Sequence, residues 1–224
     1  MSIPISILNE ATAREQVVEC GRRMHARGLI AGAEGNISVL LQPDRIIVTP
    51  SGVNKGFLHT SDLIVVNAQG QPVEGDLAPS SELKVHLAAY RANPTCRAVV
   101  HAHPPTAVAM TIARQSPAPC LIPEAILGLG EVVLAPYATP STEALAAQVE
   151  SLLAHHVVVM MERHGSLTLG RHVFEAFDRL EALEQTARIT WLATMLGPVQ
   201  ALPADEVDRL RKMALTLLSN PLSG

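Results

Sequence analysis

The sequence predicts an α/β fold in which helices cover both faces of a central sheet. In the first half, short β-branched segments are joined by turn residues, a pattern that is typical of β-hairpins and antiparallel pairing. From residue 97 onward, β-branched runs alternate with amphipathic patterns, which indicates strands interleaved with helices. Together these observations predict a three-layer α/β/α sandwich with a central mixed, largely antiparallel sheet. The length of 224 residues fits a single domain over residues 1–224.

The elements follow one another in an order that the turn and cap residues define. Gly28 is expected to cap the first helix at its C-terminal end. The expected strands, hairpins included, lie within residues 31–52, 62–75, 97–103, 131–138, 156–161 and 166–170. The expected helices cover residues 11–28, 79–90, 106–114, 141–154, 172–195 and 204–218. The long helix from residue 172 is expected to bury one apolar face that includes Trp191 and Met195.

The composition argues against several classes of partner. The formal net charge is −4 and no cluster of lysine and arginine is present, which argues against binding to nucleic acid or to a membrane surface. The three cysteines are far apart and form no CxxC pair, so neither a disulfide framework nor a thiolate metal site is expected. The N-terminus lacks a basic segment leading into an apolar one, and no apolar run is long enough for a membrane span. We therefore expect a cytoplasmic protein that acts on small solutes.

Two histidines one residue apart, His101 and His103, end an apolar strand in the stretch RAVVHAHPP. Side chains two residues apart on a strand share a face, which is the geometry that two ligands of one metal ion need. The pair fits two interpretations equally, as metal ligands or as polar residues at a strand end. A catalytic zinc site typically has three protein ligands. His164 lies where a later strand leaves the sheet and is a better third ligand than His155-His156, which precede that strand at its opposite end.

Glu82 is the acid of most interest because it lies in the expected first turn of a helix, beside two serine hydroxyls. Taken alone, its position is explained by the favourable interaction of a carboxylate with the helix dipole, about 0.3–1 kcal/mol. His86 is four residues later on the same helix face, so the two can form an acid–imidazole pair. Because the spacing is not that of HExxH, His86 is better explained as a structural residue or as one that supports a metal ligand.

Three loops contain small hydroxyl or amide residues and glycines, namely Gly35-Asn36, Thr49-Pro50-Ser51-Gly52 and Pro79-Ser80-Ser81. The sequence has no GxxxxGK[ST] or GxGxxG motif, which argues against a nucleotide. Hydroxyls and backbone amides at the start of a helix can nevertheless hold a single phosphate group. Each loop taken separately is better explained as a turn or a helix cap.

In combination, these segments resemble the class II aldolase/adducin family, whose members include fuculose-phosphate aldolase and ribulose-phosphate 4-epimerase. The resemblance extends from about Gly28 to Trp191 and is carried, in order, by EGNIS, TPSG, PSSELKVHLAAYRANP, AVVHAHPPTA, APYATPST and ERHGSLTLG. The combined string is far more specific than any single piece. It implies the fold of this family, a divalent metal and a small phosphorylated sugar as substrate.

The resemblance also implies roles for individual residues. The metal, Zn²⁺ or another divalent ion such as Mn²⁺ or Co²⁺, would be held by Glu82, His101, His103 and His164. Glu82 would also be the catalytic acid/base, and the substrate phosphate would be bound by Asn36, Ser51, Gly52, Ser80 and Ser81. The expected reaction cleaves a ketose 1-phosphate to dihydroxyacetone phosphate and an aldehyde through a metal-stabilised ene-diolate. A homotetramer with its active site at a subunit boundary is expected.

One segment departs from the family pattern. Fuculose-phosphate aldolase has a tyrosine roughly twenty residues after its HxH motif that is thought to donate a proton on the aldehyde side, but residues 115–131 contain no tyrosine. Glu124 lies in this segment as a candidate donor but is better explained as an exposed loop acid, and Tyr137 is expected to be structural. The alternatives are 4-epimerisation, dehydration or decarboxylation at the same metal site, or a non-catalytic adducin-like interaction module.

Overall fold

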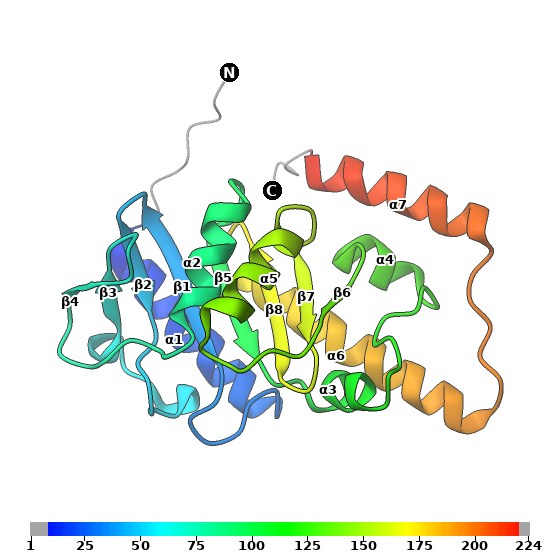
Figure 1. The fold of residues 1–224 in the computed structure, drawn as a ribbon, viewed down its shortest axis with the longest axis horizontal. Coiled ribbons are helices and arrows are strands. Elements are labelled where there is room, and N and C mark those ends of the chain that lie inside the picture. The colour runs from blue at the N-terminus through cyan, green and yellow to red at the C-terminus, as the bar shows by residue number, and fades with distance from the viewer. Residues whose placement is uncertain (1–8, 220–224) are drawn as a thin grey trace.

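A computed structural model describes residues 9–219 and has the three-layer architecture expected from the sequence (Figure 1). The strands are β1 (Asn36–Gln42), β2 (Arg45–Val48), β3 (Ile64–Val66), β4 (Pro72–Glu74), β5 (Ala98–Ala102), β6 (Val133–Ala135), β7 (Val158–Met161) and β8 (Gly165–Gly170). The helices are α1 (Glu10–Ala26), α2 (Leu83–Ala92), α3 (Pro105–Ile112), α4 (Pro123–Leu129), α5 (Glu143–Leu153), α6 (Val173–Leu196) and α7 (Ala204–Ser219). Two short 3₁₀ helices, η1 (Lys55–Phe57) and η2 (Thr60–Asp62), lie between β2 and β3.

The eight strands form one sheet in the order β4-β3-β2-β1-β5-β8-β7-β6. All neighbours pair antiparallel except β6 and β7, which are parallel. The two expected hairpins are β1–β2 and β3–β4. The prediction of a mixed, largely antiparallel sheet is therefore confirmed, and β5, the strand that contains His101, lies between β1 and β8 in its centre.

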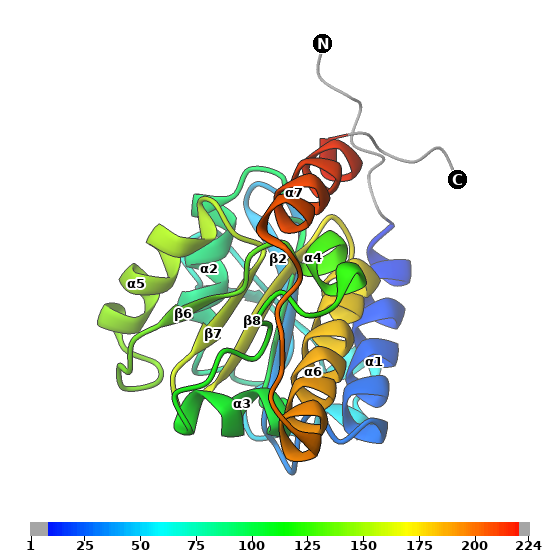
Figure 2. The ribbon, with the colours of Figure 1, turned by 90° about the vertical axis from the view of Figure 1, so that its right-hand side faces the viewer.

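Helices α2 and α5 cover one face of the sheet, and α1 and α6 cover the other (Figure 2). Alternate residues of β5 pack on opposite sides, because side chains along a strand point to opposite faces. Ala98, Val100 and Ala102 join the core formed with α1 and α6, whereas Val99 joins the core formed with α2 and α5. By the same alternation, His101 faces the α2 side of the sheet, where Glu82 precedes α2.

Helix α4 was not expected, because the sequence around it was interpreted as a loop. It has only seven residues, begins with a proline and ends before Gly130, whose φ of 65° stops the helix. Its apolar residue Ile126 packs against Val207 and Leu210 of α7. Tertiary packing therefore stabilises a helix that is too short to be predicted from periodicity.

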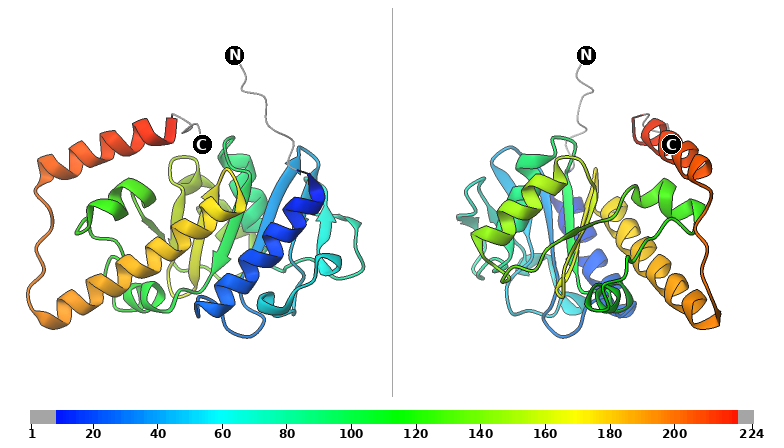
Figure 3. Two further views of the ribbon diagram at one scale, coloured as in Figure 1. Left: turned by 180° about the vertical axis from the view of Figure 1, so that it is seen from behind. Right: turned by 45° about the vertical axis from the view of Figure 1, so that its right-hand side comes forward.

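The expectation that Trp191 and Met195 are buried is wrong. Their side chains are 51% and 73% exposed, and the buried face of α6 ends at Thr190. A helix of 24 residues is about 36 Å long, and the C-terminal part of α6 continues past the strands, as seen from behind in Figure 3. Because the sheet does not extend under this end, its apolar side chains have nothing in the described chain to pack against fully.

Among residues 9–219, no helix is both long enough and apolar enough to cross a membrane. The first eight residues, which belong to the N-terminal segment expected to lack a signal peptide, lie outside the described residues.

Candidate metal centre

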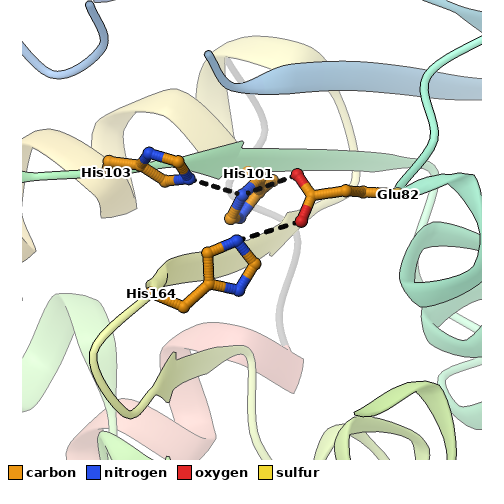
Figure 4. A group of neighbouring side chains, drawn as sticks. All are labelled: Glu82, His101, His103 and His164. Carbon is orange, nitrogen blue, oxygen red and sulfur yellow. Dashed lines mark hydrogen bonds and ion pairs between the residues drawn. The ribbon is translucent and has the colours of Figure 1, made fainter. Parts of the chain in front are cut away.

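Four side chains from separate parts of the sequence meet beside the end of β5 (Figure 4). His101 is in β5, and His103 follows the end of that strand. Because β8 pairs with β5, with Ser166 opposite Ala102, the β7–β8 turn that contains His164 lies next to both histidines. Glu82 approaches from the other layer, at the residue that precedes α2.

The side chains of Glu82, His101, His103 and His164 each offer one ligand atom, and these atoms all lie within 4.8 Å of one another. The Nε2 atom of His101 is 3.1 Å from Nε2 of His103 and 3.0 Å from Oε2 of Glu82. The Nε2 atom of His164 is 3.0 Å from the other carboxylate oxygen of Glu82. One carboxylate and three imidazoles therefore converge on a common point.

The protonation of His101 makes this donor set suitable for a cation. Its Nδ1 atom lies 2.9 Å from the carbonyl oxygen of Ser166, which can only accept, so in the neutral ring Nδ1 bears the proton. In the neutral ring the lone pair of Nε2 then points at the carboxylate of Glu82, and a positive charge here, either a second proton on the ring or a metal ion, is attracted to both atoms. Three imidazoles and a carboxylate fit a zinc-type ion, and the bond from Nδ1 to a backbone carbonyl is the usual support of a histidine ligand.

The ionisation states also fit a metal centre. Burial raises the pKa of Glu82, but the neighbouring His101 and His164 outweigh burial and hold that pKa well below its ordinary value. Burial, followed by the charge of His101, lowers the pKa of His103 to about 4. Near neutral pH the carboxyl group of Glu82 is thus ionised and the ring of His103 is neutral, which are the forms that bind metal ions.

Gly165 makes room for the two histidines of β5. A Cβ atom at this position would lie 2.3 Å from the carbonyl oxygen of Ala102. It would also lie 2.7 Å from Cδ2 of His103 and 2.9 Å from Cε1 of His101. The two imidazoles therefore keep their positions only because residue 165 has no side chain.

We expect Gly165→Ala to displace both imidazoles and to lower the metal content of the purified protein, which elemental analysis by mass spectrometry measures. Gly128→Ala is the matched control, because nothing lies within 4 Å of a Cβ atom at that position. The control should keep wild-type metal content. Equal metal content in the two variants would contradict the assigned role of Gly165.

Two of the three loops expected to bind phosphate lie side by side. Pro50 and Pro79 form an isolated antiparallel bridge. The backbone N–H of Ser51 donates to the carbonyl of Ala78 at 2.9 Å, and that of Ser80 donates to the carbonyl of Thr49 at 3.2 Å. This pairing brings Ser51 and Gly52 next to Ser80 and Ser81, and Gly52 has a φ of 72° that favours glycine in the turn.

Glu82 is not in the first turn of its helix, as was expected, but at the cap position before Leu83. Its backbone N–H is 3.3 Å from the hydroxyl oxygen of Ser80, which accepts the hydrogen bond. The serine thus holds the backbone of Glu82 at the end of the loop, and the carboxylate is directed towards the histidines rather than along the helix axis. Helix-dipole stabilisation alone therefore does not explain this residue.

Asn36, also expected at the phosphate, uses its side chain elsewhere. Its amide nitrogen donates to Oε2 of Glu82 at 3.0 Å, and its amide oxygen is 2.5 Å from Nε2 of His86. The register of the sheet explains this position, because Asn36 of β1 is directly opposite His101 of β5. The role of Asn36 in phosphate binding stays a prediction.

The other residues considered in the sequence, two histidines, a glutamate and a tyrosine, are not part of the cluster of metal ligands. His155 and His156 are in the turn before β7, Glu124 is exposed in the first turn of α4, and the side chain of Tyr137 is 58% exposed in a loop. The structure therefore gives Tyr137 no place in the core, and none of these four residues belongs to the group of ligand atoms around Glu82.

Lys55 was missed in the sequence, where a single lysine in a turn is indistinguishable from a solvated one. Its side chain is only 2% exposed, and Nζ donates to the carbonyls of Ala33 at 2.9 Å and Val53 at 2.7 Å. Burial lowers the pKa of Lys55 to about 8, against the opposing effect of Glu82. Lys55 thus ties the loop before β1 to the loop that contains Ser51 and Gly52.

Comparisons with known proteins place the chain in a family. Residues 15–191 match the model of the class II aldolase and adducin N-terminal domain, and the chain belongs to this family. It is similar to the 3-oxo-tetronate 4-phosphate decarboxylase of Escherichia coli K12, with 33% identity over 208 residues that cover 90% of this chain and 96% of that protein. It is also similar to the 5-deoxy-D-ribulose 1-phosphate aldolase of Bacillus thuringiensis, with 32% identity over 201 residues that cover 89% and 93% of the two chains.

A solved structure shows the same fold. The crystal structure of YgbL from Klebsiella pneumoniae aligns with a TM-score of 0.83 and 33% identity, over 91% of this chain and 100% of that chain. The fold and the family resemblance expected from the sequence are thus confirmed, and the relatives are enzymes named for small phosphorylated sugars or sugar acids.

Proposed function

We propose that this protein is a metal-dependent lyase that decarboxylates a small phosphorylated 3-oxo sugar acid. The observation that carries the proposal is the convergence of Glu82 with His101, His103 and His164. Such a site can stabilise and protonate an ene-diolate, and an ene-diolate is what decarboxylation of a 3-oxo acid produces. The most informative names among the relatives are those of the decarboxylase and the aldolase.

The reactions in these two names pass through one intermediate. Loss of CO₂ from 3-oxo-tetronate 4-phosphate breaks the C1–C2 bond and leaves its electron pair in the ene-diolate of dihydroxyacetone phosphate. Retro-aldol cleavage of 5-deoxyribulose 1-phosphate breaks the C3–C4 bond and leaves the same ene-diolate together with acetaldehyde. In both reactions one proton must then be added to carbon.

The residues of the centre divide this work. A divalent cation held by the three histidines and Glu82 would supply Lewis-acid stabilisation of the negative charge on the ene-diolate. Glu82, which is ionised in the free protein, would take up a proton from solvent water and deliver it to the carbon, and general acid catalysis by a positioned carboxyl group can accelerate this step by about 10²–10⁴-fold. The hydrogen bond from Asn36 fixes the plane of that carboxyl group.

The two reactions differ in the leaving group, which is CO₂ in decarboxylation and an aldehyde in retro-aldol cleavage. In retro-aldol cleavage a base must take the proton from the hydroxyl group that becomes the aldehyde, whereas CO₂ departs from a carboxylate without a proton transfer. Residues 115–131 contain no tyrosine for this task, and Glu124 is exposed. This difference supports decarboxylation, while aldol cleavage is kept as the second candidate because of the relative from Bacillus thuringiensis.

The proposal also covers the identity of the metal, the phosphate-binding residues, the cellular location and the oligomeric state. Zinc is the proposed metal because imidazole and carboxylate ligands suit it. The adjacent loops with Ser51, Gly52, Ser80 and Ser81 are proposed to bind the phosphate, with Asn36 at their edge. A cytoplasmic homotetramer is proposed as well, and the exposed apolar side chains at the end of α6 support burial against another subunit.

The products of two substrates test the proposal. Metal-loaded protein is incubated separately with 3-oxo-tetronate 4-phosphate and with 5-deoxyribulose 1-phosphate, and CO₂, acetaldehyde and dihydroxyacetone phosphate are measured. We expect equal amounts of CO₂ and dihydroxyacetone phosphate from the first substrate, with a kcat/KM about tenfold or more above that for the second. Faster release of acetaldehyde would favour the aldolase, and no turnover of either would favour a non-catalytic module.

A further inference from the structure

A line of polar side chains, of which Asn36, Ser38 and His86 are buried and Glu82 and Tyr90 partly buried, runs from the metal centre between β1 and α2. Asn36 and Ser38 of β1 are two residues apart and so share one face of the strand. His86 and Tyr90 are four residues apart on one face of α2, and Glu82, at the cap position four residues before His86, lies on the same side. The two faces meet, and the five side chains form a continuous series of hydrogen bonds.

The direction of every bond in this series follows from its two ends. A carboxylate can only accept, so the amide nitrogen of Asn36 donates to Glu82, and the amide oxygen is left to accept from Nε2 of His86. The ring of His86 therefore has its proton on Nε2. Its Nδ1 atom must then accept, at 2.7 Å, from the hydroxyl of Ser38.

Tyr90 completes the series at its far end. The proton of the Ser38 hydroxyl is used on His86, so Ser38 accepts from the phenol of Tyr90 at 2.6 Å. Burial raises the pKa of Tyr90 well above its ordinary value, which keeps the phenol protonated as this bond requires. Burial, followed by the charge of His101, lowers the pKa of His86 to about 3, which keeps its ring neutral.

We propose that Tyr90, Ser38 and His86 are positioning residues that fix and polarise the Glu82 carboxylate through Asn36. All four hydrogen bonds point towards Glu82, and bonds aligned in one direction strengthen one another. If the ring of His86 had its proton on Nδ1, the amide of Asn36 would have to turn and present its oxygen to the carboxylate. The carboxylate disfavours that state because it cannot donate to the amide oxygen, and the hydroxyl of Ser38, which does not touch the ligands, supports the tautomer that holds Glu82 by donating to Nδ1 of His86.

The matched pair Ser38→Thr and Ser38→Val tests the role of the hydroxyl. Threonine and valine have the same shape and both suit a strand, but only threonine has the hydroxyl. This inference rests on the proposed role of Glu82, so the first measurement does not involve turnover. In metal-free protein labelled with ¹⁵N-histidine, long-range correlation spectra report which ring nitrogen of His86 has the proton. The signal is assigned by its absence in His86→Gln.

We expect a neutral His86 ring with its proton on Nε2 in the wild type and in Ser38→Thr. In Ser38→Val, the Nδ1 resonance should move downfield because Nδ1 has lost its donor. A proton on Nδ1 in the wild-type protein would overturn the inference, whatever the enzyme does. Because this result is independent of activity, it separates a failure of the positioning series from a failure of the proposed function.

The second measurement is turnover of the substrate. Loss of a group that supports a site residue typically costs about 10–100-fold in activity or metal affinity. We expect the kcat of Ser38→Val to fall by this factor with little change in KM. Ser38→Thr should have a kcat near that of the wild type. The kcat of Tyr90→Phe should fall by a smaller factor than that of Ser38→Val. Wild-type kcat in both Ser38→Val and Tyr90→Phe, or equal losses in the threonine and valine variants, would overturn the inference.

Discussion

Glu82→Gln is expected to lower kcat by about 10²–10⁴-fold, which is the usual contribution of a positioned general acid or base. Glutamine has the size of glutamate and keeps an oxygen that can accept the hydrogen bond from Asn36, but it cannot transfer a proton. The fold should therefore be retained while the chemistry is lost. Circular dichroism, the melting temperature and steady-state turnover of the metal-loaded protein together measure the outcome.

The control for this variant is Glu143→Gln, the same chemical change at an exposed position. Glu143 is on α5 and forms an exposed ion pair with Lys84, which contributes little to stability. Its variant should have wild-type turnover. If Glu82→Gln kept wild-type turnover too, Glu82 would have no part in the proton transfer.

Removal of the metal is expected to have the other large effect. Dialysis against a chelator should reduce turnover to the background rate, because the cation held by the three histidines and Glu82 is the group proposed to stabilise the ene-diolate charge. Addition of Zn²⁺, Mn²⁺ or Co²⁺ should restore turnover. The metal should also raise the melting temperature, since a ligand at a hundred times its Kd stabilises the native state by about 2.7 kcal/mol.

The control for metal removal is the protein dialysed in parallel without chelator, and the metal content of both samples is measured with their turnover. Full turnover of a sample shown to contain no metal would contradict the assignment of this cluster as a metal centre. A His101→Ala variant should behave like the chelated protein, but its turnover should not return when metal is added. His101 is fully buried, so its melting temperature must be measured alongside.

Much of the fold was predictable because its signals are local. Turn residues defined the hairpins β1–β2 and β3–β4, and the helical spacing of apolar residues defined α1 and the buried part of α6. Where packing between distant segments decides the structure, prediction failed. Helix α4 depends on its contact with α7, and the exposure of Trp191 and Met195 depends on where the sheet ends.

In the candidate site, too, the features with local sequence signals were predictable, and those that depend on contacts between distant segments were not. The period of a strand was enough to place His101 and His103 together, and the end of a later strand indicated His164. That Asn36 lies opposite His101 depends on the register of β1 with β5, which no local pattern reveals. The spacing of Glu82, His86 and Tyr90 was visible in the sequence, but its meaning depends on which strand faces α2.

The most direct test of Glu82 acting on an ene-diolate is hydrogen exchange into dihydroxyacetone phosphate, because it requires neither CO₂ nor an aldehyde. Metal-loaded protein is incubated with dihydroxyacetone phosphate in D₂O, and the hydroxymethyl proton signal is followed by ¹H NMR. We predict stereospecific exchange of one of the two hydroxymethyl protons, and its loss in Glu82→Gln and in metal-free protein. No exchange with the wild-type protein, or equal exchange with Glu82→Gln, would contradict the assignment of this centre.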